Sequence, residues 1–584
     1  YALPEIQNKC IWIVAPHKLC IEKLNNEQVI DILKSKPFEI LNSNFHREIN
    51  KISDWNPRLA IMCAKLSIET QDLFALSDVS EMFEAYFSRF LKEKESLDEK
   101  ILIQTAWIIS FFYALPYKDN DLMKWILSDM NISYNDFLWA IDSLEKLELV
   151  DIQFEYVKIS EQNLATFLFY KAFIKDWLLS IKALFFNYFE NHSDRMNESI
   201  VSANNSFWDV KVKEIILPVL REYLENIKED EKKIIKIFQK FWFYLHAEVK
   251  EYITLITLAL PTIIDPKFST HTSQDTKEDF KDELLNIIGG FYRYPYEDYE
   301  DYVLLWIEYV RRRPEMFSSL IKLIHQTISF DEDDYRYWYI RQKTLFRTIL
   351  KWVSENDNLS ICLFLSIAPG FIKFSYEHTK YAGGNAFTYY YYTIDNTQEI
   401  KDLRVLIFNA LKSLYSRFPY EVLWVFKKYE ENHMYVNTTL LGEEQAEILD
   451  FIEHYLYETD FEHCLYVQEQ IIEYERQGIT NEKFNTLKQE FVCYAYDVYL
   501  RISTDRVRDK TILDFEDYRD YERLKEQDIR EYFKFRTTED IDTIYDTYLF
   551  IQRRFNRFDG QQLDYIIDQT LKENFDLGLY FLSR

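Results

Sequence analysis

Apolar residues recur at intervals of three and four along most of the chain, which is the spacing that places them on one side of an α-helix. Amphipathic stretches of this kind follow one another from residue 163 to the C-terminus, and we expect continuous helices over Ala165–Phe189 and Glu231–Leu258 among them. The succession resembles the stacked helices of TPR or HEAT arrays, although no strict repeat of 34 or 40 residues is present. We therefore predict an all-α fold ending in a degenerate α-solenoid.

Residues 99–165 have a different pattern, in which three helical stretches precede two short segments of alternating apolar and polar residues. Ser133 and Asp136 have the spacing of a capping box and open the third helix. This order predicts a winged-helix unit. The helices are expected over Ile101–Ala114, Asn120–Met130 and Ser133–Leu147, and the strands over Leu149–Ile152 and Phe154–Ile159.

Winged helices often read DNA through their third helix, so that function has to be considered. Here the third helix carries Asp136, Asp142 and Glu145 against Lys146 alone. Carboxylates at these positions would be repelled by phosphates. We interpret the unit as an internal structural module.

One segment of the array alternates like a β-hairpin. Its first arm contains Phe374, Tyr376 and His378, and the turn contains Gly383 and Gly384. The second arm presents aromatic residues at every other position: Phe387, Tyr389 and Tyr391. Tyrosine is favoured at protein interfaces, so Tyr376 and these three residues are candidates for binding a partner protein. The alternative is a hairpin that folds back to cover a core.

Composition narrows the class of protein further. The 584 residues include only nine glycines, and none occurs before Gly289, which excludes a glycine-rich phosphate loop from the first half. Acidic residues outnumber basic ones by 97 to 69, for a net charge of −28. So acidic a chain is a poor nucleic-acid binder, and we expect proteins as partners and no direct contact with nucleic acid.

The six cysteines show no CxxC spacing, and no apolar stretch is long enough to span a membrane. A basic, apolar signal segment is also absent from the first residues. Free thiols of this kind are typical of a reducing compartment. We expect a cytoplasmic protein that does not contact membranes.

A search for chemistry yields little. The sequence has no HExxH, GxSxG or GxxxxGK[ST] motif. The nearest metal-like group, His454 with His463 and Cys464, lacks a fourth ligand at a usual spacing, so we predict no metal site. Acidic runs such as Asp331–Asp334 are interpreted as solvated faces and helix starts. We predict no catalytic residues and no enzymatic activity for this chain, with an unrecognised enzyme as a remaining alternative.

One motif suggests a family. The segment Trp55-Asn56-Pro57-Arg58-Leu59-Ala60, which follows a strand-like run at 11–14 and precedes the winged-helix unit, resembles the helical lid of STAND-type AAA+ NTPases. In that family a Gly-x-Pro motif brings its proline against the adenine of the bound nucleotide. Pro57 is the matching position, with Asn56 and Arg58 beside it, while Trp55 stands where the family has glycine. Tyr1–Pro4 resembles the segment that follows the family's sensor-one strand.

The resemblance to bacterial antiviral STAND NTPases implies that nucleotide binding and partner recognition lie in different parts of the intact protein. The P-loop core, with ATP and Mg²⁺, would lie upstream of Tyr1 in the intact protein, and this chain would hold no cofactor of its own. The C-terminal helical array would recognise a foreign protein, such as a phage terminase or portal, and trigger ATP-dependent homo-oligomerisation. The alternative is a free-standing α-solenoid scaffold that binds cellular proteins and begins near Tyr1.

These inferences give a domain plan. We expect the remnant of the NTPase core and its lid over 1–98, the winged helix over 99–165, and the helical array in two parts, 166–340 and 341–584, with the hairpin near 374–392.

Overall fold

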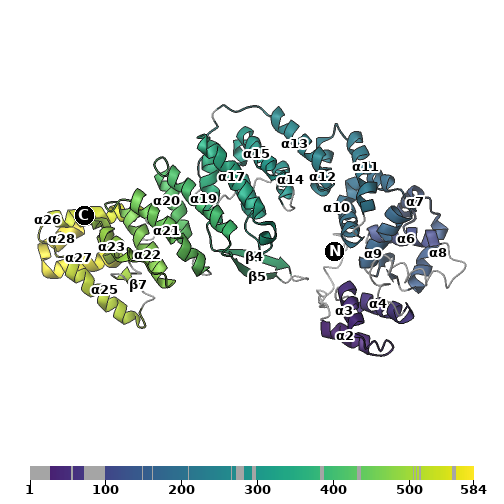
Figure 1. The fold of residues 1–584 in the computed structure, drawn as a ribbon, viewed down its shortest axis with the longest axis horizontal. Coiled ribbons are helices and arrows are strands. Elements are labelled where there is room, and N and C mark those ends of the chain that lie inside the picture. The colour runs from purple at the N-terminus through teal and green to yellow at the C-terminus, as the bar shows by residue number, and fades with distance from the viewer. Residues whose placement is uncertain are drawn as a thin grey trace. The chain divides into compact units, whose positions relative to one another are not determined.

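The computed structural model divides into two compact units, residues 1–259 and 260–584 (Figure 1). It describes residues 26–53, 57–70, 99–112, 114–147, 149–160, 162–207, 210–264, 266–270, 282–292, 298–381, 387–430, 436–503, 506–507, 510–511, 515–554 and 561–584. The strand expected at 11–14 and the helix expected over 71–98 lie outside these residues.

The first unit begins with three helices that pack on one another: α2 (Asn26–Lys34), α3 (Ser43–Ser53) and α4 (Pro57–Thr70). Val29, Leu33, Ile49 and Ala60 are fully buried and form their common core. Apolar residues at helical spacing thus place one face of each helix in this core.

The next segment combines three helices with a small antiparallel sheet. Its elements are α6 (Glu99–Phe112), β1 (Ala114–Leu115), α7 (Asn120–Asp129), α8 (Tyr134–Lys146), β2 (Val150–Gln153) and β3 (Tyr156–Ile159). Strand β3 lies between the other two and pairs with both. The predicted cap of α8 is present, because the Ser133 hydroxyl accepts a hydrogen bond from the Asp136 N–H at 3.1 Å.

Strand β1 was not expected from the sequence, which predicted helix through Ala114. The helix instead ends at Phe112, and Ala114 and Leu115 pair with Lys158 and Val157. Pro116 explains the change, since a residue that precedes proline disfavours the helical conformation.

The rest of the first unit is helical. It comprises α9 (Gln162–Phe169), a π-helical turn (Tyr170–Lys175), α10 (Ile181–Phe207), α11 (Val210–Asn226), α12 (Glu231–Phe241) and α13 (His246–Ala259). The prediction of one helix over Ala165–Phe189 is wrong, because the chain breaks after the π-turn, where Trp177 has a φ of 52°. The helix expected over Glu231–Leu258 is likewise two helices.

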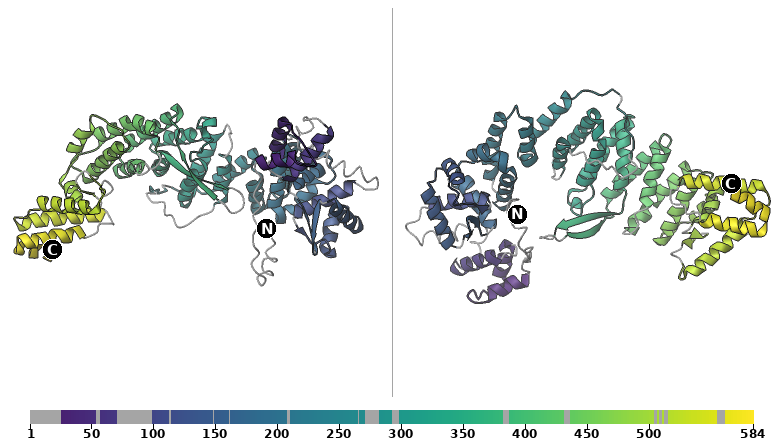
Figure 2. Two further views of the ribbon diagram at one scale, coloured as in Figure 1. Left: turned by 90° about the horizontal axis from the view of Figure 1, so that it is seen from below. Right: turned by 180° about the vertical axis from the view of Figure 1, so that it is seen from behind.

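The second unit is a stack of helices interrupted by two hairpins. The succession of helices is seen in Figures 1 and 2. Helices two apart in the chain pack side by side from α14 on α16 through α20 on α22, and again for α22 on α24, α24 on α26, α25 on α27 and α26 on α28. The elements are α14 (Glu283–Phe291), α15 (Tyr299–Arg312), α16 (Phe317–Thr327), α17 (Ile340–Ser354), α18 (Asn358–Phe371), β4 (Ser375–Tyr381), β5 (Phe387–Thr393), α19 (Gln398–Leu414), α20 (Pro419–Glu430), α21 (Thr438–Tyr455), α22 (Phe461–Arg476), α23 (Phe484–Glu490), α24 (Tyr494–Ile502), β6 (Arg506–Val507), β7 (Lys510–Thr511), α25 (Tyr518–Tyr532), α26 (Thr538–Arg554), α27 (Gln561–Glu573) and α28 (Phe575–Ser583), with 3₁₀ turns at Pro314–Met316 and Asp334–Tyr337.

This arrangement confirms the prediction of an all-α fold with a small β insertion and is compatible with an α-solenoid. The division between the compact units falls after Ala259, and α15 and α16 pack against α17 and α18 across residue 340. Among the described helices, none is both long enough and apolar enough to cross a lipid bilayer.

Candidate recognition surface

The lid residues named from the sequence are described only in part. Pro57 is the first residue of α4, a position where proline is tolerated because its missing N–H would have no partner in the helix. Arg58 follows it in the same helix, and Asn56 lies outside the described residues. The contact of these three residues with a nucleotide therefore stays a prediction.

The hairpin candidates do not share one face. The strand register pairs Tyr376 with Tyr392 and Glu377 with Tyr391. Because neighbouring residues of a strand point to opposite faces and paired residues point to the same face, Tyr376 and Tyr391 lie on opposite sides of the hairpin. Phe387 and Tyr389 lie in β5, where they pair with Tyr381 and Thr379. Tyr376, which was grouped with Phe387, Tyr389 and Tyr391 as a binding candidate, therefore lies on the other face of the hairpin.

Burial confirms this separation. Tyr376 is only 7% exposed, whereas Tyr391 is 52% exposed. The Tyr376 hydroxyl donates a hydrogen bond to the Gly370 carbonyl at 3.0 Å, and its ring meets that of Phe330. Tyr376 therefore anchors the hairpin on the helices and is not available to a partner. For this residue the alternative interpretation, a hairpin that covers a core, is the correct one.

A buried ion pair holds the base of the hairpin. Arg404 of α19 is fully buried and binds both carboxylate oxygens of Glu444 of α21, one of them at 2.9 Å. Its guanidinium also donates to the carbonyls of Ile372 at 2.8 Å and Lys373 at 2.9 Å, where α18 ends. Arg404 thus supplies donors to carbonyls that the helix leaves without partners, and it fixes the direction in which the chain enters β4.

Aromatic rings enclose this ion pair. The guanidinium lies over the rings of Phe374, 4.7 Å from its centroid, and Tyr429. The Tyr429 hydroxyl donates to the second Glu444 oxygen at 3.2 Å. Burial raises the pKa of Tyr429 well above its usual value, and the Glu444 charge adds to the rise, so this phenol stays protonated and remains a donor.

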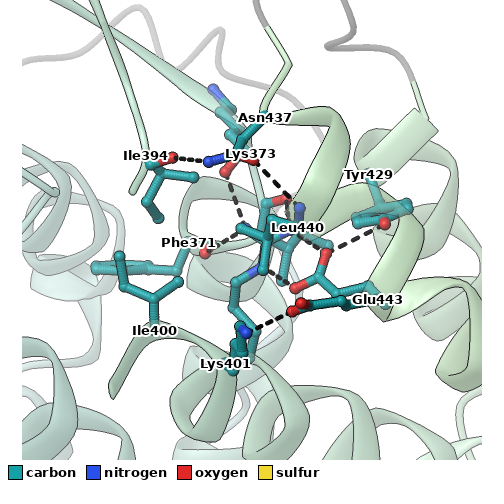
Figure 3. A network of polar contacts seen from close by, with 12 residues as sticks. Phe371, Lys373, Ile394, Ile400, Lys401, Tyr429, Asn437, Leu440 and Glu443 are labelled. Carbon is teal, nitrogen blue, oxygen red and sulfur yellow. Dashed lines mark hydrogen bonds and ion pairs between the residues drawn. The ribbon is translucent and has the colours of Figure 1, made fainter. Parts of the chain in front are cut away.

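Two outer contacts fasten the neighbouring segments (Figure 3). The Asn437 side chain donates to the Ile394 carbonyl at 3.2 Å, at the end of the hairpin, and caps α21 through the Leu440 N–H. Lys401 forms an ion pair with Glu443 at 2.6 Å, and both side chains are more exposed than those of Arg404 and Glu444. The hairpin is therefore attached to α18, α19 and α21 through a continuous polar network.

The segment before α17 places several large apolar side chains in solvent. We call it the aromatic loop and define it by Tyr335, Tyr337, Trp338 and Ile340, whose exposed fractions lie between 42 and 71%. Trp338 is the most exposed of them. Aromatic side chains of this size are normally buried, so a group of four exposed residues in six positions is a candidate binding surface.

A buried carboxylate holds the aromatic loop in place. Asp334 is 1% exposed, and its Oδ2 atom accepts hydrogen bonds from the Asp331 N–H at 2.8 Å and the Gln342 amide at 2.7 Å. Its other oxygen binds Arg341, which also donates to the Tyr292 carbonyl at 3.0 Å. The acidic run 331–334 was expected to form solvated faces and helix starts. Asp334 does begin a 3₁₀ turn, but its side chain is buried and not solvated.

The backbone of the loop is strained. Trp338 and Tyr339 both have left-handed backbone angles, with φ values of 49° and 55°. A bulky residue in this region costs roughly 1–2 kcal/mol, and two in succession are uncommon. With these backbone angles the two side chains point in different directions: Trp338 is exposed, whereas Tyr339 is 1% exposed. Such outliers often mark functional positions.

The aromatic loop and the hairpin are packed together. The ring of Phe330 contacts those of Tyr339, Phe371 and Tyr376 at centroid distances of 5.3 to 5.8 Å. The side chain of Tyr392 also lies near that of Tyr339. The exposed Tyr391 directly precedes Tyr392 in β5. One buried aromatic cluster thus supports both exposed features.

Sequence reasoning did not single out the aromatic loop. The available signal was the run Tyr335-Arg336-Tyr337-Trp338-Tyr339, which has four aromatic residues in five, lies directly after four acidic residues and has no helical spacing. Helical periodicity dominates the surrounding sequence, so the run was interpreted only through its acidic start.

The histidines considered as metal ligands have other partners. His463 interacts with the Tyr415 hydroxyl at 2.8 Å through Nε2 and accepts the Tyr457 N–H at 3.0 Å through Nδ1. Burial lowers the pKa of His463, so the ring is neutral near pH 7. Within the described part of the chain, no group of His, Cys, Asp and Glu residues has the geometry of a metal site.

Comparison with known proteins does not identify a family for this chain. No family model, no curated protein and no solved structure matches this chain.

Proposed function

We propose that this chain is the sensor portion of a STAND-type NTPase in antiphage defence, and that it recognises a foreign protein through its C-terminal helical unit. The observation that carries the recognition part is the aromatic loop, which exposes Trp338 and its neighbours on a backbone fixed by buried Asp334. Rigid, exposed aromatic residues provide binding energy at low entropic cost.

The charge around the loop defines the partner's chemistry. Asp331, Glu332 and Asp333 precede the aromatic residues, and the chain as a whole carries a net charge of −28. A protein partner should therefore present lysine or arginine beside an apolar pocket, so that cations meet the acidic residues and the tryptophan ring. A phage terminase or portal is the class of partner that the family resemblance suggests.

The nucleotide part of the proposal rests on the resemblance of the 55–60 segment to the NTPase lid. Segment 99–160 supports it through topology, because three helices with a sheet of order β1-β3-β2 match the winged helix that follows the lid in this family. Pro57→Ala should weaken nucleotide retention in the intact protein. Unchanged nucleotide occupancy would contradict the lid assignment without affecting the recognition surface.

The recognition part is tested with two tryptophan variants. Trp338→Gly should weaken binding of the chain to purified phage terminase or portal by about thirtyfold or more, as expected for a central hot-spot residue. Trp177→Gly is the matched control, because Trp177 lies in the first unit, is 73% exposed and has a φ of 52°. Its affinity should not change.

Two outcomes would contradict the proposal. Equal affinity of the folded Trp338→Gly variant and the wild type would exclude the aromatic loop as the recognition surface. Constitutive binding of cellular proteins, with no binding of phage proteins, would favour the free-standing scaffold instead.

A further inference from the structure

Two cysteines from separate helices meet in the second unit. Cys464 lies in α22 and is fully buried, and Cys493 is the half-buried residue immediately before α24. Their side chains lie close enough to affect each other's protonation. The Cys464 thiol donates its proton to the Glu458 carbonyl at 3.1 Å.

Hydrogen bonds from Gln468 hold the segment before Cys493 against α22. Gln468 follows Cys464 by four residues and therefore lies on the same side of α22. Its amide donates to the carbonyls of Lys488 at 2.8 Å and Phe491 at 3.0 Å, and Phe491 is two residues before Cys493. The approach of the two sulfur atoms is thus a consequence of local packing and does not depend on the thiols alone.

The surroundings of the two thiols differ in a way that suits distinct roles. The contact with Cys464 lowers the pKa of Cys493, and the backbone N–H groups of Ala495 and Tyr496, in the first turn of α24, act in the same direction. The same contact, together with burial, raises the pKa of Cys464. Cys493 is therefore the better nucleophile and the more accessible sulfur.

We propose that Cys493 and Cys464 form a peroxide-sensitive thiol pair, in which Cys493 is oxidised first and Cys464 resolves the product to a disulfide between α22 and the start of α24. This modification site is independent of the proposed recognition of a foreign protein.

The chemistry balances with a hydroperoxide as the oxidant. The Cys493 thiolate attacks one peroxide oxygen, so that an S–O bond forms and the O–O bond breaks, and the departing oxygen leaves as an alcohol or water after taking a proton. The Cys464 sulfur then attacks the Cys493 sulfenic acid. An S–S bond forms, the S–O bond breaks, and the departing hydroxide takes the Cys464 proton to leave as water.

Mass spectrometry on the full chain tests the proposal with hydrogen peroxide as the probe. After treatment and blocking of the remaining thiols, a non-reducing digest should contain a linked pair of peptides with Cys464 and Cys493, which dithiothreitol separates. Cys493→Ser should abolish the link. Cys362→Ser should leave it intact, because burial raises the pKa of Cys362 to about 11 and its thiol donates to Phe268.

Alkylation of the unmodified chain gives a second readout that needs no variant. The rate for Cys493 with iodoacetamide should fall less than twofold between pH 9 and pH 7, whereas an ordinary thiol slows by roughly twentyfold over this range. A normal slope for Cys493, or a folded, peroxide-treated chain that lacks the 464–493 link, would overturn the proposal.

Discussion

The guanidinium of Arg404 and the carboxylate of Glu444 form a two-point ion pair inside the second unit, where neither side chain is more than 4% exposed. The pair joins α19 to α21, and through the carbonyls of Ile372 and Lys373 it also holds the end of α18. Burial of Arg404 opposes its charge, but the Glu444 carboxylate outweighs this and raises the pKa of Arg404. Arg404 therefore stays charged at neutral pH.

Removal of one partner should be costly. Arg404→Met leaves the Glu444 charge buried without a counter-ion, which typically destabilises a protein by about 3–5 kcal/mol. Hydrogen exchange should report the loss at the base of the hairpin, around Ile372–Phe374. The double variant Arg404→Met with Glu444→Leu should recover part of the loss, though not the donors to the α18 carbonyls.

The neighbouring pair of Lys401 and Glu443 provides the control. It joins the same two helices, but both side chains are substantially exposed. Lys401→Met should therefore change stability by less than about 1 kcal/mol. A similar loss for the Lys401 and Arg404 variants would show that burial does not govern the Arg404–Glu444 pair.

Trp338 and Tyr339 both have left-handed backbone angles, but replacing each with glycine should change stability in opposite directions. Trp338→Gly should leave stability unchanged or raise it by up to about 1 kcal/mol, because glycine relieves the strain and the lost ring was exposed. Tyr339→Gly relieves the same strain but removes a buried ring, and should cost about 3 kcal/mol. Thermal unfolding of both variants measures the difference, and equal effects would contradict the assigned packing.

Two helical glycines make a second matched pair. A Cβ atom at Gly370 would meet the His325 ring at 2.1 Å, so Gly370→Ala should destabilise α18 by about 1–3 kcal/mol. At Gly442 the nearest atom would be 4.0 Å away, and Gly442→Ala should stabilise α21 by up to about 1 kcal/mol. Urea unfolding of the two variants should shift in opposite directions.

The lowered pKa of His325 predicts that the folded chain loses stability in mild acid. Burial, together with the nearby Lys373 charge, lowers the pKa of this half-buried ring to about 4 from its ordinary value of 6.5. The unfolded chain therefore takes up a proton as the pH falls below 6.5, while the folded chain does so only near pH 4. The stability present above pH 6.5 declines between these values, by about 2 kcal/mol at pH 5.

Hydrogen exchange of α16 and α18 at pH 7.5 and pH 5.0, corrected for intrinsic rates, measures this decline. His325→Gln removes the titrating ring and should show a smaller decline than the wild type. Identical pH dependence in the two chains would mean that His325 is not responsible.

The sequence by itself determined the elements whose signal is local. Periodic apolar positions predicted α7 and α8, and the capping-box spacing predicted the Ser133 cap, because a helix forms hydrogen bonds only with residues one turn away. The alternation around residues 374–392 likewise predicted a hairpin. Trp177 shows the limit of such signals, since the apolar pattern runs on through a position where the backbone leaves the helix.

Only the tertiary structure decided which faces of these elements are covered. Strand register placed Tyr376 against Phe330 and left Tyr391 in solvent, although both fit the same alternating pattern. The burial of Asp334 and of Arg404 depends on partners that are distant in the chain or lie on other helices, such as Glu444. Each buried charge is stable only because hydrogen bonds and an opposite charge offset the cost of removing it from water. Those partners come together only in the folded chain, so the spacing of residues along the sequence does not reveal them.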